Sequence, residues 1–536
     1  MTDTLATCLR RCPYLEPQAP VTIGRFVRLI RTTMKHFLLR RPALAPFLLV
    51  LLLTSCQAQQ PEQPNKYERY LSEAHARGQF NGAALVFDKG KLVYEGAFGL
   101  RSIDPIDSLD LNSQFRLASV SKQFTAMCIM LLKEQGKLRY DQDIRDFIPE
   151  LPYTGITIRH LLNHTSGLPD YEPLMDQNWK TELKFDDPAR YTDGNADVIK
   201  MLVEKKPPVL FQPGAQWAYS NTGYNLLGTI VARASGISFA AYAKQNIFEP
   251  AGMSHTSFYD FVIGTDPKMP DRAYGFQVEW NGTSMIPADS HYLNHGEGED
   301  GVYSTVSDLL KWDRILYTDK LIPKATLEEA FTPGVLNNGD RTDYGFGWHL
   351  ERSPTGKRVV SHSGGWLSFS TYIYRGIEED KCMVVLMNNS SLYFWPIVEG
   401  VKNILYDTAY ALPALSIREV MGKDIAENGV EHAIAQYRTI KAERASEFHI
   451  TEGALNLLGY NLLWAGRVDD AAAILKLTME EYPSSANVYD SYGDALLAQG
   501  DTANALENFK KSFAMDATMT ATKEKIDTIE AGVKGR

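Results

Sequence analysis

A serine and a lysine three residues apart, Ser119 and Lys122, are the first residues in this sequence whose types and spacing could do chemistry. Apolar residues follow them at helical spacing, and Gly136 comes where the helix would end. Residues i and i+3 share one face of a helix, so the amine can reach the hydroxyl. A serine becomes a strong nucleophile when a base removes its proton, and a desolvated lysine can be that base. Taken alone, the pair is better explained by an ordinary first helical turn with a solvated lysine.

Two further groups of polar residues lie later in the chain. Tyr219 and Asn221 come where a turn gives way to a helical pattern, a place from which side chains can project into a cleft. The pattern Y-x-N also occurs at Tyr292 to Asn294, so it discriminates poorly by itself. His362 and Gly364 are the ends of a His-Ser-Gly motif that precedes an apolar strand pattern. A buried tyrosine and a strand-end histidine explain these positions at least as well when each is taken alone.

A polar cluster between residues 291 and 300 contains side chains of the types that bind metals. Its members are His291, His295, Glu297, Glu299 and Asp300. Three glycines interrupt the cluster, and they break any helix that would fix the ligands. A loop at the rim of a cleft is the better interpretation, and we predict no metal site and no cofactor.

The whole chain has the composition of a folded globular protein, with 536 residues of which 44% are hydrophobic. This length predicts two or more domains. A net charge of -10 argues against general nucleic-acid binding. The five cysteines are few and scattered, so we predict no disulfide framework.

The N-terminal part of the sequence has the pattern of an export signal. A basic patch precedes an apolar run at residues 47–53, which is short for a final membrane anchor. The run leads into Leu-Thr-Ser-Cys ending at Cys56, which resembles a bacterial lipobox. We therefore predict a signal peptide over 1–56, with Met34 as an alternative start, then a tether over 57–66. Lipidation at Cys56 would place the protein on the periplasmic face of the outer membrane or on the cell surface; a non-lipidated signal peptide is the alternative.

Residues 67–412 have strand patterns at both ends and helical patterns in the middle. A helix is predicted at 66–76. The strand patterns lie at 83–87, 92–97, 344–350, 358–365, 369–374 and 382–387. We expect an α/β (α+β) domain in which one antiparallel sheet is built from both ends of the segment and helices pack on it.

Beyond the last strand, residues 413–536 are helical and repeat at an interval of 34 residues. Gly459 recurs as Gly493, and Leu462 recurs as Leu496. This period is typical of tetratricopeptide repeats, in which paired helices approach closely at glycine. The stretch Ile425 to Glu443 lies outside the register and is a candidate for a third helix pair. We expect an all-α domain that binds a protein partner.

The ordered set Ser119-x-x-Lys122, Tyr219-x-Asn221 and His362-Ser363-Gly364 resembles the serine β-lactamase and penicillin-binding-protein superfamily. The closest likeness is to its class C-like branch of esterases and D-aminopeptidases. The resemblance implies that Ser119 is the acylated nucleophile, Lys122 its base and Tyr219 an acid/base residue. It further implies that Asn221 orients the substrate and that the oxyanion lies between the N–H groups of Ser119 and Gly365.

The third motif departs from the superfamily pattern, in which lysine usually stands at the position of His362. That lysine helps to bind the substrate carboxylate, whereas histidine carries only a partial charge near neutral pH. We therefore expect an esterase or a D-amino-acid peptidase rather than a strong β-lactamase, with the ring of His362 at the cleft wall beside Gly364. The alternative is a catalytically weak scaffold that docks cell-envelope partners through its helical tail.

Overall fold

The computed structural model describes residues 65–175, 194–258 and 269–534. The predicted signal peptide, its Cys56 and most of the predicted tether lie outside this part of the chain. Among the described residues, no single helix has the length and apolar composition of a membrane span. One bent pair of core helices, Asn221–Ser235 with Phe239–Ala251, meets both criteria together.

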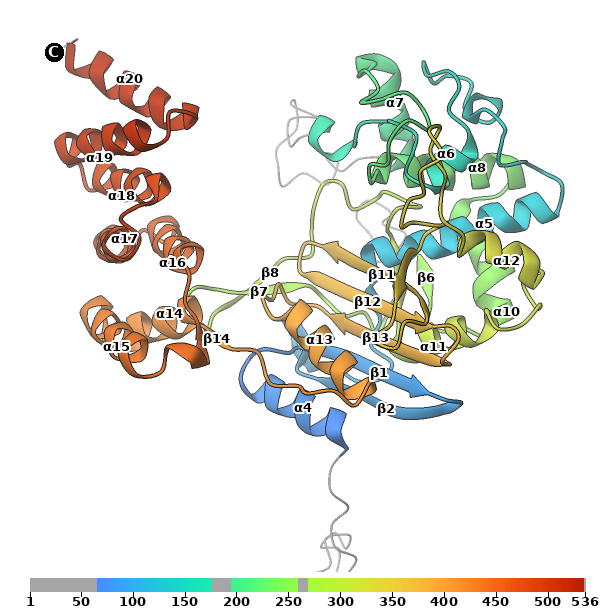
Figure 1. The fold of residues 1–536 in the computed structure, drawn as a ribbon, viewed down its shortest axis with the longest axis horizontal. Helices are drawn as coiled ribbons and strands as arrows, with labels where there is room; N and C mark the ends of the chain where they lie inside the picture. Colours follow the sequence, from blue (N-terminus) through green and yellow to red (C-terminus); the bar gives the residue numbers. More distant parts are fainter. Residues whose placement is uncertain (1–64, 176–193, 259–268, 535–536) are drawn as a thin grey trace, which may run out of the picture. The chain divides into compact units, whose positions relative to one another are not determined.

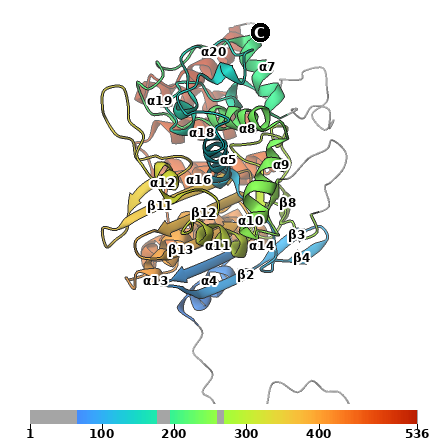
Figure 2. The ribbon, with the colours of Figure 1, turned by 90° about the vertical axis from the view of Figure 1, so that its right-hand side faces the viewer.

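The centre of the fold is a six-stranded antiparallel sheet in the order β10-β11-β12-β13-β1-β2. In chain order the strands are β1 (Gly82–Asp88), β2 (Lys91–Phe98), β10 (His349–Arg352), β11 (Arg358–Trp366), β12 (Phe369–Gly376) and β13 (Lys381–Met387). Figure 2 shows the succession from β11 through β12 and β13 to β2. Strand β1 pairs with β13, so the two ends of the segment meet in the middle of the sheet. The predicted sheet built from both ends is confirmed.

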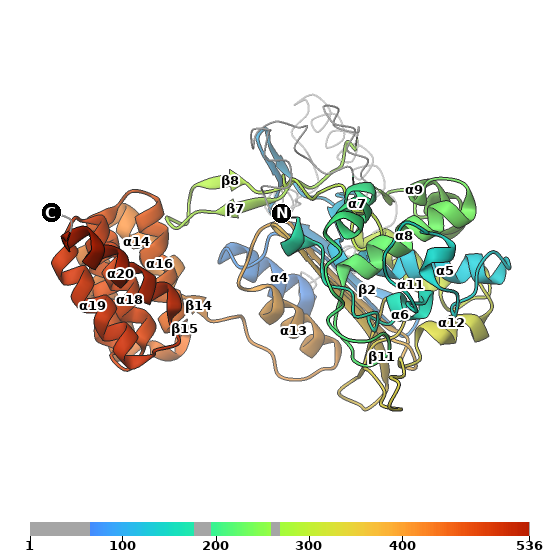
Figure 3. The same ribbon diagram turned by 90° about the horizontal axis from the view of Figure 1, so that it is seen from above.

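Alternate residues of the central strands serve two different cores, as a pleated strand requires. Ala84 and Val86 of β1 belong to a cluster with α4 (Lys66–Ala76) and α13 (Phe394–Leu405). Leu85 faces the other way, into the core that contains the other helices of this domain. Those helices include α5 (Lys122–Glu134), α8 (Asn221–Ser235) and α11 (Val306–Ile315). Figures 1 and 3 show the two helical layers on opposite faces of the sheet.

Shorter elements complete this domain and connect its layers. They are β3 (Leu100–Ile103), β4 (Ile106–Ser108), β5 (Phe115–Arg116), α6 (Ile158–Leu162), α7 (Asn195–Lys205), α9 (Phe239–Ala243), α10 (Glu249–Ala251), β6 (Ser257–Phe258), β7 (Phe276–Val278), β8 (Met285–Pro287), β9 (Val302–Ser304) and α12 (Lys324–Ala330). Strand β9 lies between β5 and β6. This small sheet brings the segment before Ser119 next to the segment that follows the polar cluster.

One predicted strand, residues 344–350, is wrong over most of its length, because β10 begins only at His349. The segment before it packs tightly against other backbone. A Cβ on Gly345 would lie 2.0 Å from the carbonyl oxygen of Ala330, and one on Gly347 would lie 2.8 Å from that of Lys122. The glycines therefore allow close packing against neighbouring backbone, and the aromatic residues that alternate with them, Tyr344, Phe346 and Trp348, are buried in the core.

The C-terminal region is helical, as predicted, and is built mainly from successive antiparallel helix pairs. Its elements are β14 (Leu415–Ser416), α14 (Ile417–Asn428), α15 (Val430–Glu443), β15 (Phe448–His449), α16 (Glu452–Trp464), α17 (Val468–Glu481), α18 (Ala486–Ala498), α19 (Thr502–Met515) and α20 (Thr520–Lys534). A Cβ on Gly459 would lie 2.4 Å from Leu475, and one on Gly493 would lie 2.6 Å from Phe509. The repeated glycines therefore allow the close helix pairing that the 34-residue interval predicts. The stretch Ile425 to Glu443 is divided at Gly429 between α14 and α15.

Candidate active site

The nucleophile candidate lies in a short 3-10 helix, Ala118–Ser121, that leads directly into α5. Ala118 has a φ of 49°, in the left-handed region that costs an alanine about 1 kcal/mol. Strained backbone of this kind is concentrated at functional sites. Ser119 follows at the start of the helix, where a backbone N–H has no partner within the helix. The predicted helix start is confirmed, with a 3-10 first turn.

Strand β11 lies against this turn and depends on a glycine to do so. A Cβ on Gly364 would lie 2.1 Å from the carbonyl oxygen of Leu117, two residues before the serine. Thr371 of the neighbouring strand donates its hydroxyl to the same oxygen at 2.6 Å. Gly364 therefore sets the close approach of strand and helix, and the next residue, Gly365, lines the pocket together with Ser119.

Lys122 is fully buried, and its Nζ lies within hydrogen-bonding distance of three oxygens. Nζ is 3.0 Å from Oγ of Ser119, 2.8 Å from Oδ1 of Asn221 and 3.0 Å from the backbone carbonyl oxygen of Glu299. The prediction that the amine reaches the serine hydroxyl is confirmed. Two of the three oxygens come from segments about 100 and 177 residues away, so the folded domain assembles the site.

Asn221 is the first residue of α8, and the side chain of Ser220 caps this helix by accepting from the N–H of Gly223. The amide nitrogen of Asn221 donates to the Glu172 carboxylate at 2.9 Å, which turns its Oδ1 toward Lys122. The ring of Tyr219 lies on the other side of the lysine, with Nζ 4.9 Å from the ring centre. Both Tyr219 and Asn221 of the Y-x-N motif therefore lie beside Lys122.

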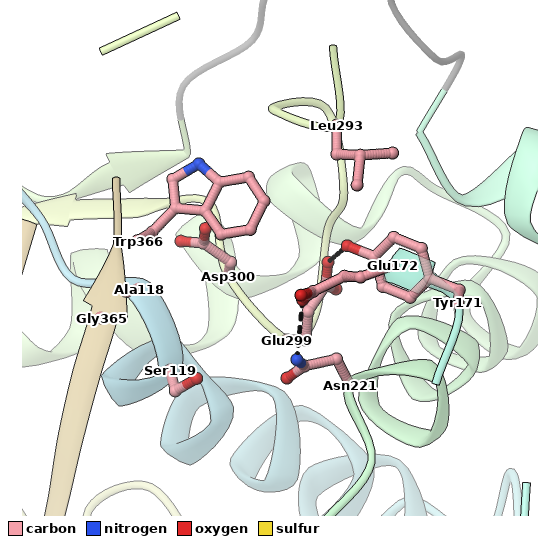
Figure 4. Close-up of a pocket in the computed structure, with 10 residues that line it drawn as sticks. All are labelled: Ala118, Ser119, Tyr171, Glu172, Asn221, Leu293, Glu299, Asp300, Gly365 and Trp366. Atoms are coloured by element: carbon pink, nitrogen blue, oxygen red, sulfur yellow. Dashed lines mark hydrogen bonds between the residues drawn. The ribbon is translucent and has the colours of Figure 1, made fainter. Parts of the chain in front are cut away.

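A pocket with roughly 300 Å³ of empty space opens over Ser119 (Figure 4). Of the predicted site residues, Ser119, Asn221 and Gly365 line it. Most of the other side chains that line the pocket have no predicted role in this site. These are Tyr171, Glu172, Leu293, Glu299, Asp300 and Trp366. The only signal for any of them was the polar cluster at 291–300, which was interpreted as a cleft rim; it contributes both Glu299 and Asp300 to the lining.

The three carboxyl groups of the pocket are in different electrostatic environments. Asp300 forms a buried ion pair with Arg116 at 2.8 Å. Glu299 accepts a hydrogen bond from the hydroxyl of Tyr171 at 2.8 Å, and burial raises the pKa of Glu299 to about 7. Burial also raises the pKa of Glu172, and the nearby Asp170 carboxylate acts in the same direction. Carboxyl groups whose pKa is raised by burial are frequent at functional sites.

His362 departs from its prediction, because its ring is buried and only 1% of the residue is exposed. Its Nε2 lies 2.9 Å from the hydroxyl of Tyr344, and its Nδ1 lies 2.6 Å from the carbonyl oxygen of Ser363. Burial lowers the pKa of His362 well below its usual range, and the neighbouring His349 and Lys122 act in the same direction. The expectation that the ring of His362 lies at the cleft wall, where a substrate could contact it, is therefore wrong.

The buried His362 should make folding sensitive to acid. An unfolded histidine takes up a proton below about pH 6.5, whereas the native ring stays neutral, so unfolding binds a proton there. The native state should lose up to about 1.4 kcal/mol of stability for each pH unit below about 6.5, relative to a His362→Gln variant. Denaturant unfolding of both proteins between about pH 7.5 and 5 measures this difference.

The comparison with His362→Gln cancels the opposite contribution of Glu299 and Glu172. Their raised pKa values make the native state bind more protons than the unfolded chain above about pH 4.5, so their protonation favours folding as the pH falls. A stability difference that stays constant across this pH range would show that the native His362 is not held neutral.

Comparison with known proteins gives matches to the domain that carries the sheet. The family described as Beta-lactamase matches residues 67–393. Penicillin-binding protein 4* of Bacillus subtilis (strain 168) is 40% identical over 352 residues, 64% of this chain and 75% of that protein. D-aminopeptidase of Gluconobacter oxydans (strain 621H) is 25% identical over 316 residues, 58% of this chain and 56% of that protein. The crystal structure of a penicillin binding protein from Bacillus halodurans has a TM-score of 0.55 at 24% identity and covers 64% of this chain and 100% of that one.

Proposed function

Because the chain belongs to the beta-lactamase family of serine hydrolases, we propose that it works through an acyl-enzyme on Ser119. The observation that carries the proposal is the environment of Lys122. A neutral amine has two N–H groups and one lone pair, and Asn221 and Glu299 provide acceptors for both N–H groups. The lone pair is then left for the hydroxyl proton of Ser119, 3.0 Å away.

In the proposed reaction the serine oxygen attacks the substrate carbonyl carbon while its proton moves to Lys122. The developing oxyanion accepts hydrogen bonds from the backbone N–H groups of Ser119 and Gly365, two residues that line the same pocket. The bond to the leaving group breaks as that group takes the proton from Lys122, and we assign the relay of this proton to Tyr219, whose ring centre lies 4.9 Å from Nζ. Water then attacks the ester carbonyl and releases the acid, which restores the hydroxyl of Ser119.

We propose D-amino-acid amides, short D-amino-acid peptides or esters as the substrate class. The similarity to a D-aminopeptidase supports this choice. The buried, uncharged His362 argues against strong β-lactam hydrolysis, because the motif that holds a substrate carboxylate in β-lactamases has no cation here. The test is a panel of D- and L-amino-acid p-nitroanilides, an acetyl ester and a chromogenic cephalosporin. Hydrolysis of the cephalosporin with the highest kcat/KM, or of none of these substrates, would contradict the proposal.

For the helical tail we propose a protein-docking role without any part in the chemistry. The residues that line the pocket all lie between Ala118 and Trp366. Deleting residues 415–536 should therefore leave kcat/KM for a small amide within about twofold, once the folded fraction is measured by circular dichroism. A large loss of specific activity in soluble, folded, truncated protein would show that the tail supports the site.

We also propose that the protein is exported and held at a membrane by lipid on Cys56. The lipobox-like sequence after the apolar run supports this localisation. Cys56→Ser should move the protein from the membrane fraction to the soluble fraction, since several acyl chains give stable anchoring. Membrane association that is unchanged in this variant would contradict the lipid anchor.

A further inference from the structure

Two carboxyl groups in the pocket, those of Glu172 and Glu299, have no cationic side chain paired with them among the described residues. Glu299 is only 4% exposed, and its carboxyl oxygens contact the hydroxyl of Tyr171 at 2.8 Å and the amide of Asn225 at 3.5 Å. Glu172 accepts from the amide of Asn221. The third carboxyl of the pocket, Asp300, already has a cation in Arg116.

The amine of Lys122, the base of the proposed reaction, has its hydrogen-bond partners elsewhere. The amine of Lys122 faces Ser119, Asn221 and a backbone carbonyl oxygen, and it forms no ion pair with either glutamate in the described part of the chain. Removing a carboxylate from water without a cationic partner is costly, and a ligand cation bound beside it would offset that cost. A positively charged ligand group beside the two glutamates would therefore be favoured.

Another wall of the pocket contains a large aromatic ring. Trp366, at the end of β11, lies apart from the two glutamates and next to Asp300 (Figure 4). The indole N–H of Trp366 donates to the side chain of Asn294 at 2.7 Å, which fixes the ring in place. A substrate that reaches Ser119 in this pocket can therefore contact both the two glutamates and the indole ring of Trp366.

We propose that Glu172 and Glu299 bind the free ammonium group of the substrate while its apolar side chain packs against Trp366. This inference rests on the proposed hydrolase function and names its substrate class as amino-acid amides and peptides with an unmodified amine. Substrates with an acylated amine are disfavoured because they leave both carboxyl groups without a partner. Substrates with a free carboxylate at this position are repelled by the two glutamates, and the guanidinium of Arg116 beside the pocket is already paired with Asp300.

The ionisation of the two partners supports this pairing near neutral pH. Burial raises the pKa of Glu299 to about 7, so its carboxyl is ionised at pH 7.5 to about two thirds or more. The α-amine of a peptide titrates near about 8 and is largely protonated at the same pH. The assay is therefore set at about pH 7.5, where both charges are present.

The test is a pair of substrates that differ only in the amine, D-phenylalanine p-nitroanilide and its N-acetyl derivative. The full-length wild type should cleave the free amine with a kcat/KM at least about tenfold higher, as expected for charge-assisted contacts. Glu299→Gln and Glu172→Gln should each reduce this ratio severalfold. Glu204→Gln, which removes an exposed carboxylate on α7, is the matched control and should leave the ratio unchanged.

The ratio separates charge recognition from general damage to the site. Glu172 also orients Asn221, so its loss can slow both substrates, but only loss of ammonium binding changes their ratio. If the melting temperature shows that one glutamate variant does not fold, the substrate ratio of the other glutamate variant tests the inference. This inference is overturned if the wild type shows no preference for the free amine, or if the ratio is unchanged in the folded variants. In either case, labelling of the serine by a phosphonate would still support the proposed hydrolase function. Absence of labelling and of turnover overturns the proposed function and this inference together.

Discussion

Ser119→Ala should abolish covalent labelling by a serine-directed phosphonate and lower amide turnover by roughly 10³-fold or more. The reason is that no other hydroxyl in the pocket has the three features of this one. It lies 3.0 Å from the buried amine of Lys122, it follows a strained Ala118, and it lines the pocket beside Gly365. Intact-protein mass spectrometry after incubation with the phosphonate measures labelling, and initial rates with a D-amino-acid amide measure turnover.

The matched control is Ser121→Ala, two residues further along the same turn. The hydroxyl of Ser121 is buried and accepts a hydrogen bond from the backbone N–H of Val302 at 3.2 Å, so it has a structural partner, and Ser121 is not among the residues that line the pocket. This variant should lose about 1 kcal/mol of stability and keep its labelling. Labelling of Ser119→Ala at the wild-type rate would show that a different residue is the nucleophile.

The sequence predicted those parts of the fold that follow from local periodicity. The helix Lys66–Ala76 has the bounds read from its apolar spacing, and the first hairpin, the 369–374 and 382–387 strands and the helical tail are all present. Alternation and helical spacing depend on which face of one element is buried, and a single segment carries that information. The pairing of β1 with β13 was also predictable, because strand patterns occurred only at the two ends of the domain.

The predicted strand at 344–350 was wrong because its glycines are explained by distant partners. Gly345 and Gly347 lie against backbone atoms of Ala330 and Lys122, and nothing within the segment itself indicates these neighbours. An alternating aromatic and glycine pattern is compatible with a strand and with a tightly packed bend. Only the packing of the whole domain distinguishes the two.

In the site too, residues within local motifs could be predicted, whereas residues brought in by distant segments could not. Ser119, Lys122 and Asn221 were predictable, since helical spacing and motif order bring them together. Glu172 and Glu299 were not assigned roles, because the burial of a glutamate beside the nucleophile depends on the loops that cover it. His362 was expected to face substrate on the strength of its motif, but the neighbouring Tyr344 provides a buried partner that the motif does not contain.

Lys122→Met should lower kcat/KM for a D-amino-acid amide by roughly 10²–10⁴-fold, the range expected for loss of a positioned general base. Methionine has a similar length and fills the same buried volume, but it accepts no proton from Ser119. The variant leaves Asn221 Oδ1 and the carbonyl of Glu299 without their donor. Each loss costs about 1–3 kcal/mol, whereas removing a buried amine is itself often stabilising by a similar amount.

The free energy of unfolding of Lys122→Met should therefore stay within about 2 kcal/mol of wild type, so the lost activity cannot be attributed to unfolding. Lys133→Met provides the matched control on the same helix. Its amine is partly exposed and pairs with Glu134 and Glu329 outside the pocket, so activity should not change. Initial rates and denaturant unfolding of the three proteins give both quantities. Near-normal turnover in folded Lys122→Met would mean that Ser119 is activated by another base, and the assignment of Lys122 as that base would then be wrong.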